Sequence, residues 1–343
     1  MKKIWVLMGL GFLVILVGMG FLIQNRIEDK STLTKSNLYK EGQKPIVGFC
    51  LDSIVIERFQ KDIDIFKNKA EELGFEVEVF NAYESNDNQV KQIRKLVEQG
   101  AVAICILAYD KDGLSEVIAE AKKKGVLIIA YDRLINNANV DAYVSFDNVK
   151  VGELMAKGLV EAVPKGNYVI INGSPLDHNS EMFNEGYYKV LQPYIDRGDI
   201  QVVEEVWAEN WREEFAIESV SRLLSEGTEL QAIIGANDRL AEGAISVLSE
   251  YELVGKVQVV GHDADISACQ KIVEGKQLLT VYKPIKNLAQ GSAQLIYDLL
   301  HEKAKAAEEK IFDGKYQVPF YKFDVIAVDA SNMMDTVIKD QFH

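Results

Sequence analysis

A set of short polar segments combines basic, acidic, amide and aromatic side chains in a way that could bind a small polar molecule. Each segment follows a short run of residues that are typical of a β-strand. The segments are Leu51-Asp52 with Glu57-Arg58-Phe59, Tyr131–Arg133, Asn172–Asn179, Trp207–Trp211, Gly235–Asp238, Gly261–Asp265 and Val281–Pro284. Arginine and lysine donate hydrogen bonds, aspartate accepts them, and asparagine does both.

This mixture of side chains suits a monosaccharide. A sugar ring carries hydroxyl groups that both donate and accept, and these surround apolar C–H faces that aromatic rings can cover. A buried polar group left without a partner costs about 1–3 kcal/mol, so such a site discriminates between epimers. For a single residue such as Asp238 or Asp265, helix capping is the more common role. For the whole set, with cations and aromatic rings at matching positions, ligand binding is the better interpretation.

The elements that must position these segments alternate along the chain from residue 45. Strands are predicted over residues 46–51, 76–80, 101–107 and 126–131, and helices over 57–73, 88–99 and 114–124. The first helix has Phe59, Ile63, Phe66 and Ala70 at spacings of three and four, which place them on one face. Such successive strand–helix units predict a parallel sheet with helices on both faces.

The same alternation restarts after residue 148. Helices are predicted over residues 149–163, 181–191, 212–225 and 240–249, and strands over 168–172, 200–206, 232–235 and 257–261. Two such runs indicate two doubly wound lobes. Ligands of open α/β sheets bind beyond the carboxyl ends of the strands. Two lobes that face each other along those ends therefore predict a cleft that can close on its ligand.

At these segments the sequence resembles the type I periplasmic sugar-binding proteins, and most specifically their D-xylose-binding members. The resemblance covers residues 45 to about 343. Its motifs are Ile56–Asp62, Ala130–Arg133 with Ile135-Asn136, Ser145–Asn148 with Val151–Leu154, Gly173–Pro175, Ala236–Asp238, Gly261–Asp265 and Thr280–Pro284. Together these motifs are far more specific than any one of them.

The resemblance implies a ligand set for D-xylose. The residues expected to form hydrogen bonds with the sugar are Arg58, Arg133, Asn179, Asn237, Asp263 and Lys283. Trp211 is expected to stack on one face of the ring and Phe59 to cover the other, although the family usually has tryptophan at the position of Phe59. Asp132 is expected to orient Arg133 or to contact a hydroxyl. His262, where the family often has glutamine, is interpreted as a support residue beside the ligand.

The implied fold is α/β, with two doubly wound parallel-sheet lobes joined by a three-segment hinge. The crossovers are expected near residues 146–148, 281–284 and 320–325. The N-terminal lobe would comprise residues 45–146 and 285–321, including a helix from Leu288 to about Lys310. The C-terminal lobe would comprise residues 147–281 and 325–343.

The N-terminus predicts a membrane anchor. Residues Ile4 to Ile23 carry no charge, and a helix of that length spans a hydrocarbon core of about 30 Å. The apolar part of a secretory signal is shorter, about 7–15 residues. Residues 1–23 are therefore expected to form a cytoplasmic stub and a single-pass anchor in the cell membrane, and residues 24–44 a tether. The ligand-binding lobes would lie outside the cytoplasm; a cleaved signal is the alternative.

Composition and absent motifs exclude several other classes of function. The 343 residues carry a formal net charge of −14, which repels phosphate backbones and argues against nucleic-acid binding. Cys50, Cys105 and Cys269 are isolated and are interpreted as buried apolar residues. The sequence has no Gly-rich phosphate loop, His-Glu-x-x-His motif or Gly-x-Ser-x-Gly nucleophile motif. No catalytic residue, metal or cofactor is therefore predicted.

These observations favour a non-catalytic, membrane-anchored D-xylose receptor that passes its signal to a membrane sensor kinase. The alternative is the substrate-binding component of a xylose ABC transporter, in contact with a membrane permease. A sugar-responsive transcription factor would need a basic DNA-binding segment before residue 45, where this chain has an apolar one. A sugar-modifying enzyme is the remaining alternative. The neighbouring carboxylates Asp263 and Asp265 could suggest glycoside hydrolysis, but the cationic donors of the same site argue against it.

Overall fold

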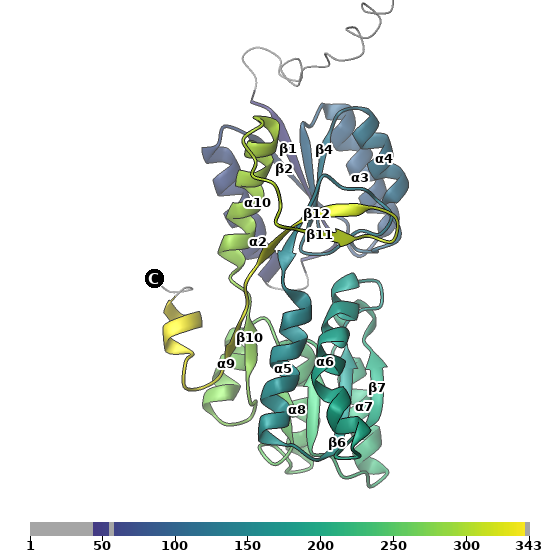
Figure 1. Ribbon diagram of the computed structural model, residues 1–343, viewed down its shortest axis with the longest axis vertical. Helices are drawn as coiled ribbons and strands as arrows, with labels where there is room; N and C mark the ends of the chain where they lie inside the picture. The colour runs from purple at the N-terminus through teal and green to yellow at the C-terminus, as the bar shows by residue number, and fades with distance from the viewer. Residues whose placement is uncertain (1–43, 55–57, 340–343) are drawn as a thin grey trace, which may run out of the picture. The chain divides into compact units, whose positions relative to one another are not determined.

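The first sheet of the computed structural model, which describes residues 44–54 and 58–339, has seven strands. Their order is β11-β12-β5-β4-β3-β1-β2, and all neighbouring pairs are parallel except β11–β12. The strands are β1 (Ile46–Leu51), β2 (Glu76–Asn81), β3 (Ala103–Ile106), β4 (Leu127–Tyr131), β5 (Ala142–Phe146), β11 (Glu309–Phe312) and β12 (Gln317–Phe323). Helices α2 (Arg58–Glu72) and α10 (Ile285–Leu300) cover one face, and α3 (Asn86–Gln99) and α4 (Ser115–Lys123) cover the other (Figure 1). We call this unit the first lobe.

The second lobe has a four-stranded parallel sheet of order β7-β6-β8-β9 and a two-stranded antiparallel sheet, β10-β13. The strands are β6 (Gly166–Asn172), β7 (Ile200–Trp207), β8 (Ala232–Gly235), β9 (Gln258–Val260), β10 (Thr280–Tyr282) and β13 (Ile326–Val328). The α-helices are α5 (Asn148–Ala162), α6 (His178–Asp196), α7 (Glu214–Ser225), α8 (Asp238–Glu250) and α9 (Ile266–Val273). A short 3₁₀ helix, Glu209–Trp211, follows β7, and a π-helical turn, Met334–Ile338, follows β13. These sheets confirm the predicted α/β class.

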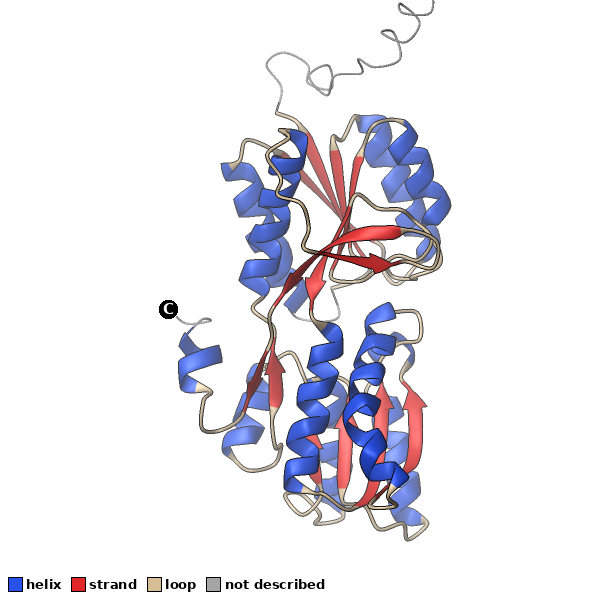
Figure 2. Ribbon diagram, viewed as in Figure 1, coloured by secondary structure: helices blue, strands red, loops and turns tan. Residues whose placement is uncertain are grey.

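The described chain passes from one lobe to the other at three places (Figure 2). The first lies between β5 and α5, the second between β10 and α10, and the third between β12 and β13. Two of these segments are bonded to each other. The backbone N–H of Asp147 donates to the carbonyl of Phe323 at 3.1 Å, and Lys322 Nζ lies 3.2 Å from Asp147 Oδ2. The hinge segments are thus coupled where the lobes meet.

Three sequence predictions on element ends are corrected by the structure. The helix predicted to reach Lys310 ends at Leu300, and Glu309–Phe312 is a strand instead. No large apolar residue follows Leu300 until Ile311, so a longer helix would have nothing to bury, and the segment pairs with β12 instead. Strand β12 also stays in the first sheet to Phe323, beyond the predicted lobe end at residue 321. Helix α6 begins at His178 rather than Glu181, because Asp177 caps it.

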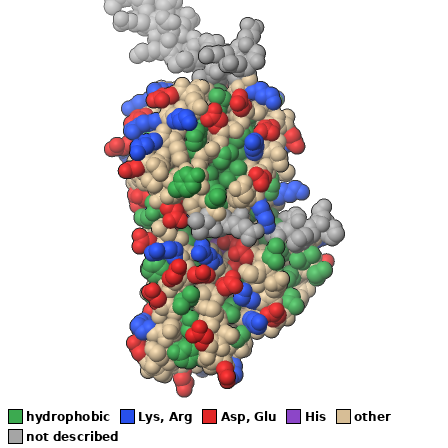
Figure 3. Space-filling model, turned by 180° about the vertical axis from the view of Figure 1, so that it is seen from behind, with side chains coloured by type: hydrophobic (Ala, Val, Ile, Leu, Met, Phe, Trp, Pro, Cys, Tyr) green, Lys and Arg blue, Asp and Glu red, His purple; other side chains and the backbone are tan. Residues whose placement is uncertain are grey.

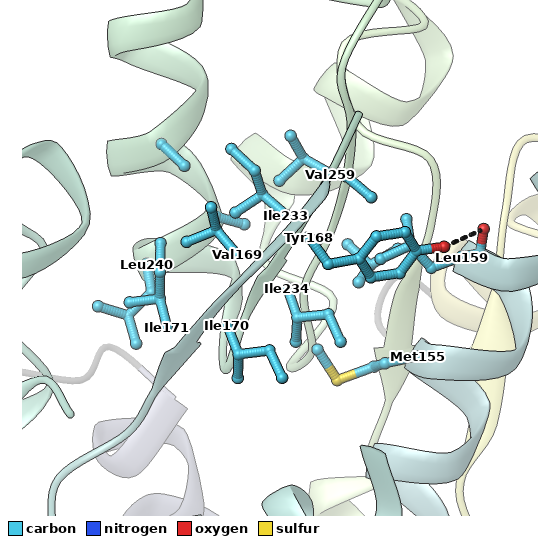
Figure 4. Close-up of a cluster of buried hydrophobic side chains, with 14 of the residues drawn as sticks. Met155, Leu159, Tyr168, Val169, Ile170, Ile171, Ile233, Ile234, Leu240 and Val259 are labelled. Atoms are coloured by element: carbon cyan, nitrogen blue, oxygen red, sulfur yellow. Dashed lines mark hydrogen bonds between the residues drawn. The ribbon is translucent and has the colours of Figure 1, made fainter. Parts of the chain in front are cut away.

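The core of the second lobe forms because strand β8 and much of β6 are buried on both faces, as is typical of parallel strands. Figure 4 shows Val169, Ile171, Ile233 and Val259 among the packed side chains. Burying one such side chain contributes about 1.5–3 kcal/mol. The three cysteines are also free and buried, which confirms their interpretation as apolar packing residues.

Helices α5 and α6 approach each other closely at two glycines. A Cβ atom at Gly152 would collide with the backbone carbonyl of Phe183, and one at Gly186 would collide with that of Val149. Only glycine permits this close backbone approach. The contact brings the first turns of the two helices, which reach the hinge and the cleft, next to each other.

The surface of the described chain carries both signs of charge. On the face shown in Figure 3, basic and acidic side chains are interspersed, with no broad basic area on that face. Within residues 44–54 and 58–339, no helix has the length and apolar character needed to cross a bilayer. The predicted anchor, residues 1–23, lies outside the described residues, as does the predicted tether up to residue 43.

Candidate functional site

The structure brings all nine predicted ligand residues together around one cavity between the lobes. The space between the lining residues is small, about 280 Å³ including the part that is open to solvent, and suits a small ligand. Its lining consists of Arg58, Phe59, Asp132, Arg133, Asn179, Trp211, Asn237, Asp263 and Lys283, together with Asp177, Phe183 and His262. All of these residues are buried except Asp263, which is partly exposed although its side chain is only 7% exposed.

The first-lobe wall is built around two arginines that follow strand ends. Arg58 Nη2 lies 2.7 Å from Asp132 Oδ1, and Arg133 Nη1 lies 2.7 Å from Asp52 Oδ2. The Phe59 ring contacts both guanidinium groups, whose Cζ atoms lie 4.9 and 5.5 Å from the ring centroid. These cation–π contacts hold the ring in place. The wall therefore offers two oriented guanidinium groups beside a flat apolar face.

Two residues that do not line the cavity, Asp62 and Tyr131, support Arg58. Asp62, one helical turn further along α2, has Oδ2 3.9 Å from Arg58 Nε and accepts a 2.7 Å hydrogen bond from Tyr131 through Oδ1. Burial raises the pKa of Asp62 to about 6, although Arg58 and the Tyr131 hydroxyl both act to lower it. The charge of Asp62, next to Arg58, therefore changes at mildly acidic pH.

Trp211 forms the aromatic part of the second-lobe wall. Its backbone has φ of 58°, which is a left-handed conformation that a tryptophan rarely adopts. A Cβ atom at Gly173 would collide with the Trp211 ring, so glycine is required there for the ring to sit against the end of β6. The indole Nε1 is buried, and among the described residues no hydrogen-bond partner reaches it. Such an atom is available to a ligand hydroxyl.

Asn237 and Asp238 have different roles although they are adjacent. Asn237 caps α8 by accepting a 2.9 Å hydrogen bond from Leu240 N, so its amide nitrogen remains to face a ligand. Asp238 accepts hydrogen bonds from Gln277 Nε2 at 2.8 Å and Thr280 Oγ1 at 2.9 Å. Asp238 does not line the cavity but ties β10 to α8. The expectation that Asp238 caps a helix is thus corrected for α8, whose cap is Asn237.

Asp263 and Lys283 form the most strongly charged contact of the site. Lys283 Nζ lies 2.7 Å from Asp263 Oδ1, and Arg58 Nη1 lies 4.0 Å from the same oxygen. Burial acts to raise the pKa of Asp263, but Lys283, His262 and Arg58 hold it well below its usual range. Burial and Lys283 together lower the pKa of His262 to about 3, so its imidazole is neutral. Its ring packs on Phe183, with centroids 4.5 Å apart.

Two cavity residues were missed by the sequence prediction. Asp177 Oδ2 lies 2.7 Å from Arg133 Nε, and Asp177 Oδ1 accepts the backbone N–H of Asn179 as the cap of α6. An aspartate directly before a helix is a capping signal, which could have identified the start of α6. Phe183 lies four residues after Asn179 and therefore on the same helix face.

Contacts across the cleft hold the two lobes together. Besides the Arg133–Asp177 ion pair, Tyr109 donates a 3.2 Å hydrogen bond to Asn210 Oδ1, and Lys111 Nζ donates one of 2.6 Å to the carbonyl of Pro175. Cations and carboxylates within the cavity are paired with one another. Because the charges are already balanced, the site favours a neutral ligand with hydroxyl groups over an ion. Across the described ranges, no three His, Cys, Asp or Glu side chains are grouped to hold a metal ion.

Comparison with known proteins gives matches over most of the chain. Residues 47–304 match a family model described as a periplasmic binding protein domain. The chain is 44% identical over 313 residues to a D-xylose-binding periplasmic protein of Haemophilus influenzae, covering 91% of this chain and 94% of that protein. It is 40% identical over 314 residues to the protein of the same description from Escherichia coli, covering 91% and 95%.

A solved structure shows the same arrangement of elements. It is an ABC transporter solute binding protein from Clostridium phytofermentans with bound β-D-glucose, with a TM-score of 0.80 and 28% identity. The match covers 87% of this chain and 98% of that one. The similarity thus includes both lobes and the segments that surround the cavity.

Proposed function

The chain belongs to the periplasmic binding protein family, and on that premise we propose that it binds D-xylose outside the cytoplasm as the substrate-binding component of an ABC transporter. The observation that carries the proposal is the convergence of the nine predicted residues on one buried cavity. Relatives that are 40–44% identical are named for D-xylose. The ABC transporter role is named for the structural neighbour with bound glucose.

The chemistry of the cavity supports a pyranose ring as the ligand. Trp211 and Phe59 supply flat apolar surfaces from opposite lobes, which suit the two C–H faces of a sugar. The guanidinium groups, amides and carboxylates between them supply donors and acceptors for hydroxyl groups. The small space between the lining residues suits one ring better than an oligosaccharide. We expect each of the nine residues to contact the sugar or to orient one that does.

Capture without chemical conversion is the expected activity. The carboxylates of the cavity are paired with cations, and Asp263 is held ionised by Lys283. Glycoside hydrolysis needs a carboxyl group with a raised pKa opposite an ionised carboxylate. Among the carboxyl groups of the described residues that line the cavity, only that of Asp177 has a raised pKa, and it is paired with Arg133. Incubation with xylose should leave the sugar unchanged by NMR. A new carbohydrate signal would contradict the proposal.

Calorimetric titration of the purified chain against D-xylose, D-ribose, D-glucose and L-arabinose tests the ligand. We expect the largest affinity for xylose. Ribose and arabinose each invert at least one hydroxyl group and would leave a buried donor or acceptor without a partner, and glucose adds a hydroxymethyl group to a small cavity. The absence of heat with xylose would contradict the proposed ligand.

A membrane-anchored sensor is the second candidate, and the observation that favours it is the uncharged segment from residue 4 to residue 23. In that case the xylose-bound lobes would act on a sensor kinase in the same membrane. Isolation of the full-length chain from membranes, followed by identification of bound proteins, distinguishes the two. Recovery of a permease and its ATPase without a kinase supports transport, whereas recovery of a kinase alone supports the sensor.

A further inference from the structure

Asp132, one of the proposed sugar ligands, has an unusual backbone conformation that other residues must hold in place. Its φ is 62°, in the left-handed region that is rare for residues other than glycine. Its carbonyl accepts hydrogen bonds from Ser145 Oγ at 2.6 Å and from Asn179 Nδ2 at 3.0 Å, and Tyr143 OH lies 3.2 Å away. The conformation therefore depends on β5 of the first lobe and on α6 of the second.

Asn148 lies behind this cluster and does not line the cavity. It is the first residue of α5, directly after the first crossover between the lobes, and is 2% exposed. Its Nδ2 lies 2.9 Å from Asn179 Oδ1 and 3.2 Å from Ser145 Oγ. Asn148 is thus bonded to two of the groups that surround the Asp132 carbonyl.

The bond from Asn148 is the shorter of two that fix which way the Asn179 amide faces, since Tyr143 OH also lies 3.3 Å from Asn179 Oδ1. The Nδ2 of Asn148 can only donate, so it requires the oxygen of Asn179. With that oxygen fixed, the Nδ2 of Asn179 must point to the Asp132 carbonyl. If the Asn179 amide were turned over, its NH₂ group would face the NH₂ group of Asn148, and its oxygen would face the carbonyl oxygen of Asp132. Asn148 therefore selects the one orientation of Asn179 that supports Asp132.

A capping role does not explain Asn148. The cap of α5 is the preceding residue, Asp147, whose side chain accepts the backbone N–H of Lys150 at 3.1 Å. The close approach of α5 and α6 at Gly152 and Gly186 places Asn148 beside Asn179 within the second lobe. Their bond does not cross the cleft, whereas the bond from Asn179 to Asp132 does. The amide can therefore be oriented before the lobes close.

We propose that Asn148 is a positioning residue of the sugar site, which orients Asn179 so that closure of the lobes fixes Asp132 against Arg58 and the sugar. The inference rests on the proposed sugar-binding function. Without Asn148, the Asn179 amide keeps only the 3.3 Å bond from Tyr143 OH and its own bond to the Asp132 carbonyl, so the donor that the Asp132 peptide receives from the opposite lobe is less firmly oriented. The Asp132 carboxylate, 2.7 Å from Arg58, then loses its fixed position.

The experiment compares Asn148→Ala and Asn148→Asp in the full chain by calorimetric titration with D-xylose. At pH 7.5 we expect both variants to raise the Kd about tenfold or more. Asn148→Asp should be at least as damaging as Asn148→Ala, because a carboxylate has nearly the shape of the amide but repels the oxygen of Asn179. If Asn148 only filled space, the order would be reversed. Thermal unfolding of the sugar-free variants shows whether each is folded.

A pH series sharpens the test. A protonated carboxyl group at position 148 can donate to Asn179 again, so the Kd ratio of Asn148→Asp to Asn148→Ala should fall between pH 7.5 and pH 5. The two variants share the titrating groups around the cluster, which include Asp132, Asp177, Asp62 and His262, so the effects of those groups cancel in the ratio.

The matched control is Asn184→Ala, which removes an asparagine of α6 whose amide donates to Asn172 and Glu205 away from the cavity. Its xylose affinity should equal that of the unmodified chain. Unchanged affinity in both Asn148 variants would overturn the inference, and so would a milder effect of Asn148→Asp with a ratio independent of pH. If the unmodified chain does not bind xylose, the proposed function itself fails.

Discussion

The two walls of the cavity are held in place by different physical means. On the first lobe, side chains mainly fix one another: Arg58 pairs with Asp132, and Arg133 pairs with Asp52. Of the cavity residues on this lobe, only Asp132 has a left-handed backbone. On the second lobe, backbone conformation contributes more to the positions of the side chains. Trp211 and Asp263 have φ of 58° and 103°, and Asn237 is fixed as a helix cap.

This difference predicts which changes should disturb each wall of the cavity. The first-lobe wall depends mainly on charge balance, so changes of charge or pH should disturb it. The second-lobe wall depends on loop conformation, so most of its side chains can be truncated without leaving charges unpaired. The exceptions are Asp177, which pairs with Arg133, and Asp263, which pairs with Lys283 and approaches Arg58 of the opposite lobe.

Asp263→Ala should have the largest effect on affinity. The variant leaves the Lys283 ammonium without its partner at 2.7 Å and removes the carboxylate nearest to Arg58 Nη1. Truncating one member of a buried charged pair costs about 2–5 kcal/mol. We expect xylose affinity to fall at least about thirtyfold at pH 7.5, as measured by calorimetric titration. A circular dichroism melt checks that the variant is folded; near-normal affinity would show that Asp263 is not a ligand.

Trp211→Ala should have the next largest effect and act by a different route. It removes an aromatic surface from the second-lobe wall without unpairing any charge, and a stacked aromatic group at the centre of a site is worth about 2 kcal/mol. We expect a loss of about thirtyfold in xylose affinity with little dependence on salt. Trp211→Phe, which keeps a ring, serves as the control and should lose less. Equal losses in both variants would argue against stacking.

The sequence predicted which residues lie around the cavity better than it predicted the ends of the elements near them. Each of the nine residues lies directly after a strand or near a helix start, where α/β folds place ligands, and the family motifs selected among them. The predicted type I fold, with two doubly wound lobes and a three-segment hinge, is confirmed by the family match and the structural neighbours. The hydrophobic pattern along the sequence was sufficient to predict the fold, because these strands are short, buried and rich in β-branched residues.

Features that depend on distant contacts could not be predicted. Strand β11 lies in a segment rich in alanine, lysine and glutamate, and it forms only because it pairs with β12 at the sheet edge. The contact of Asn148 with Asn179 depends on the glycine-mediated approach of α5 and α6. Asp177 was overlooked because its pairing with Arg133 joins residues of different lobes. These contacts arise from packing, which sequence periodicity does not encode.

Arg133→Lys tests the first-lobe wall and should have a moderate effect. Arg133 uses two separate nitrogens, Nη1 toward Asp52 and Nε toward Asp177, and a lysine ammonium cannot reach both positions at once. We expect xylose affinity to fall about tenfold, because one carboxylate loses its charged partner. Calorimetry at two salt concentrations provides the measurement. Full affinity in the lysine variant would mean that only the positive charge at this position matters.

Asp62→Asn should have the smallest effect on affinity, but it tests whether the first-lobe wall depends on pH. The pKa of Asp62 is raised to about 6 in the folded chain, mainly by burial, from an ordinary value near 4. Between these values the folded state holds a proton that the unfolded state has released. The free energy of unfolding contributed by this group therefore falls as pH rises from about 4 to 6, by about 1.4 kcal/mol per pH unit.

Asparagine keeps the oxygen that accepts from Tyr131 but cannot titrate, so Asp62→Asn removes this dependence. The unfolding free energy of the unmodified chain, minus that of the variant, should thus decrease between pH 4 and 6 and level off above. His262, with its pKa lowered to about 3, acts in the opposite direction, but it is present in both proteins and cancels in the difference. Denaturant titrations at several pH values provide the measurement, and the exposed Asp64→Asn on the same helix is the control. If the difference in unfolding free energy stays constant between about pH 4 and 6, Asp62 is ionised over this range, and Arg58 is paired with a permanent negative charge.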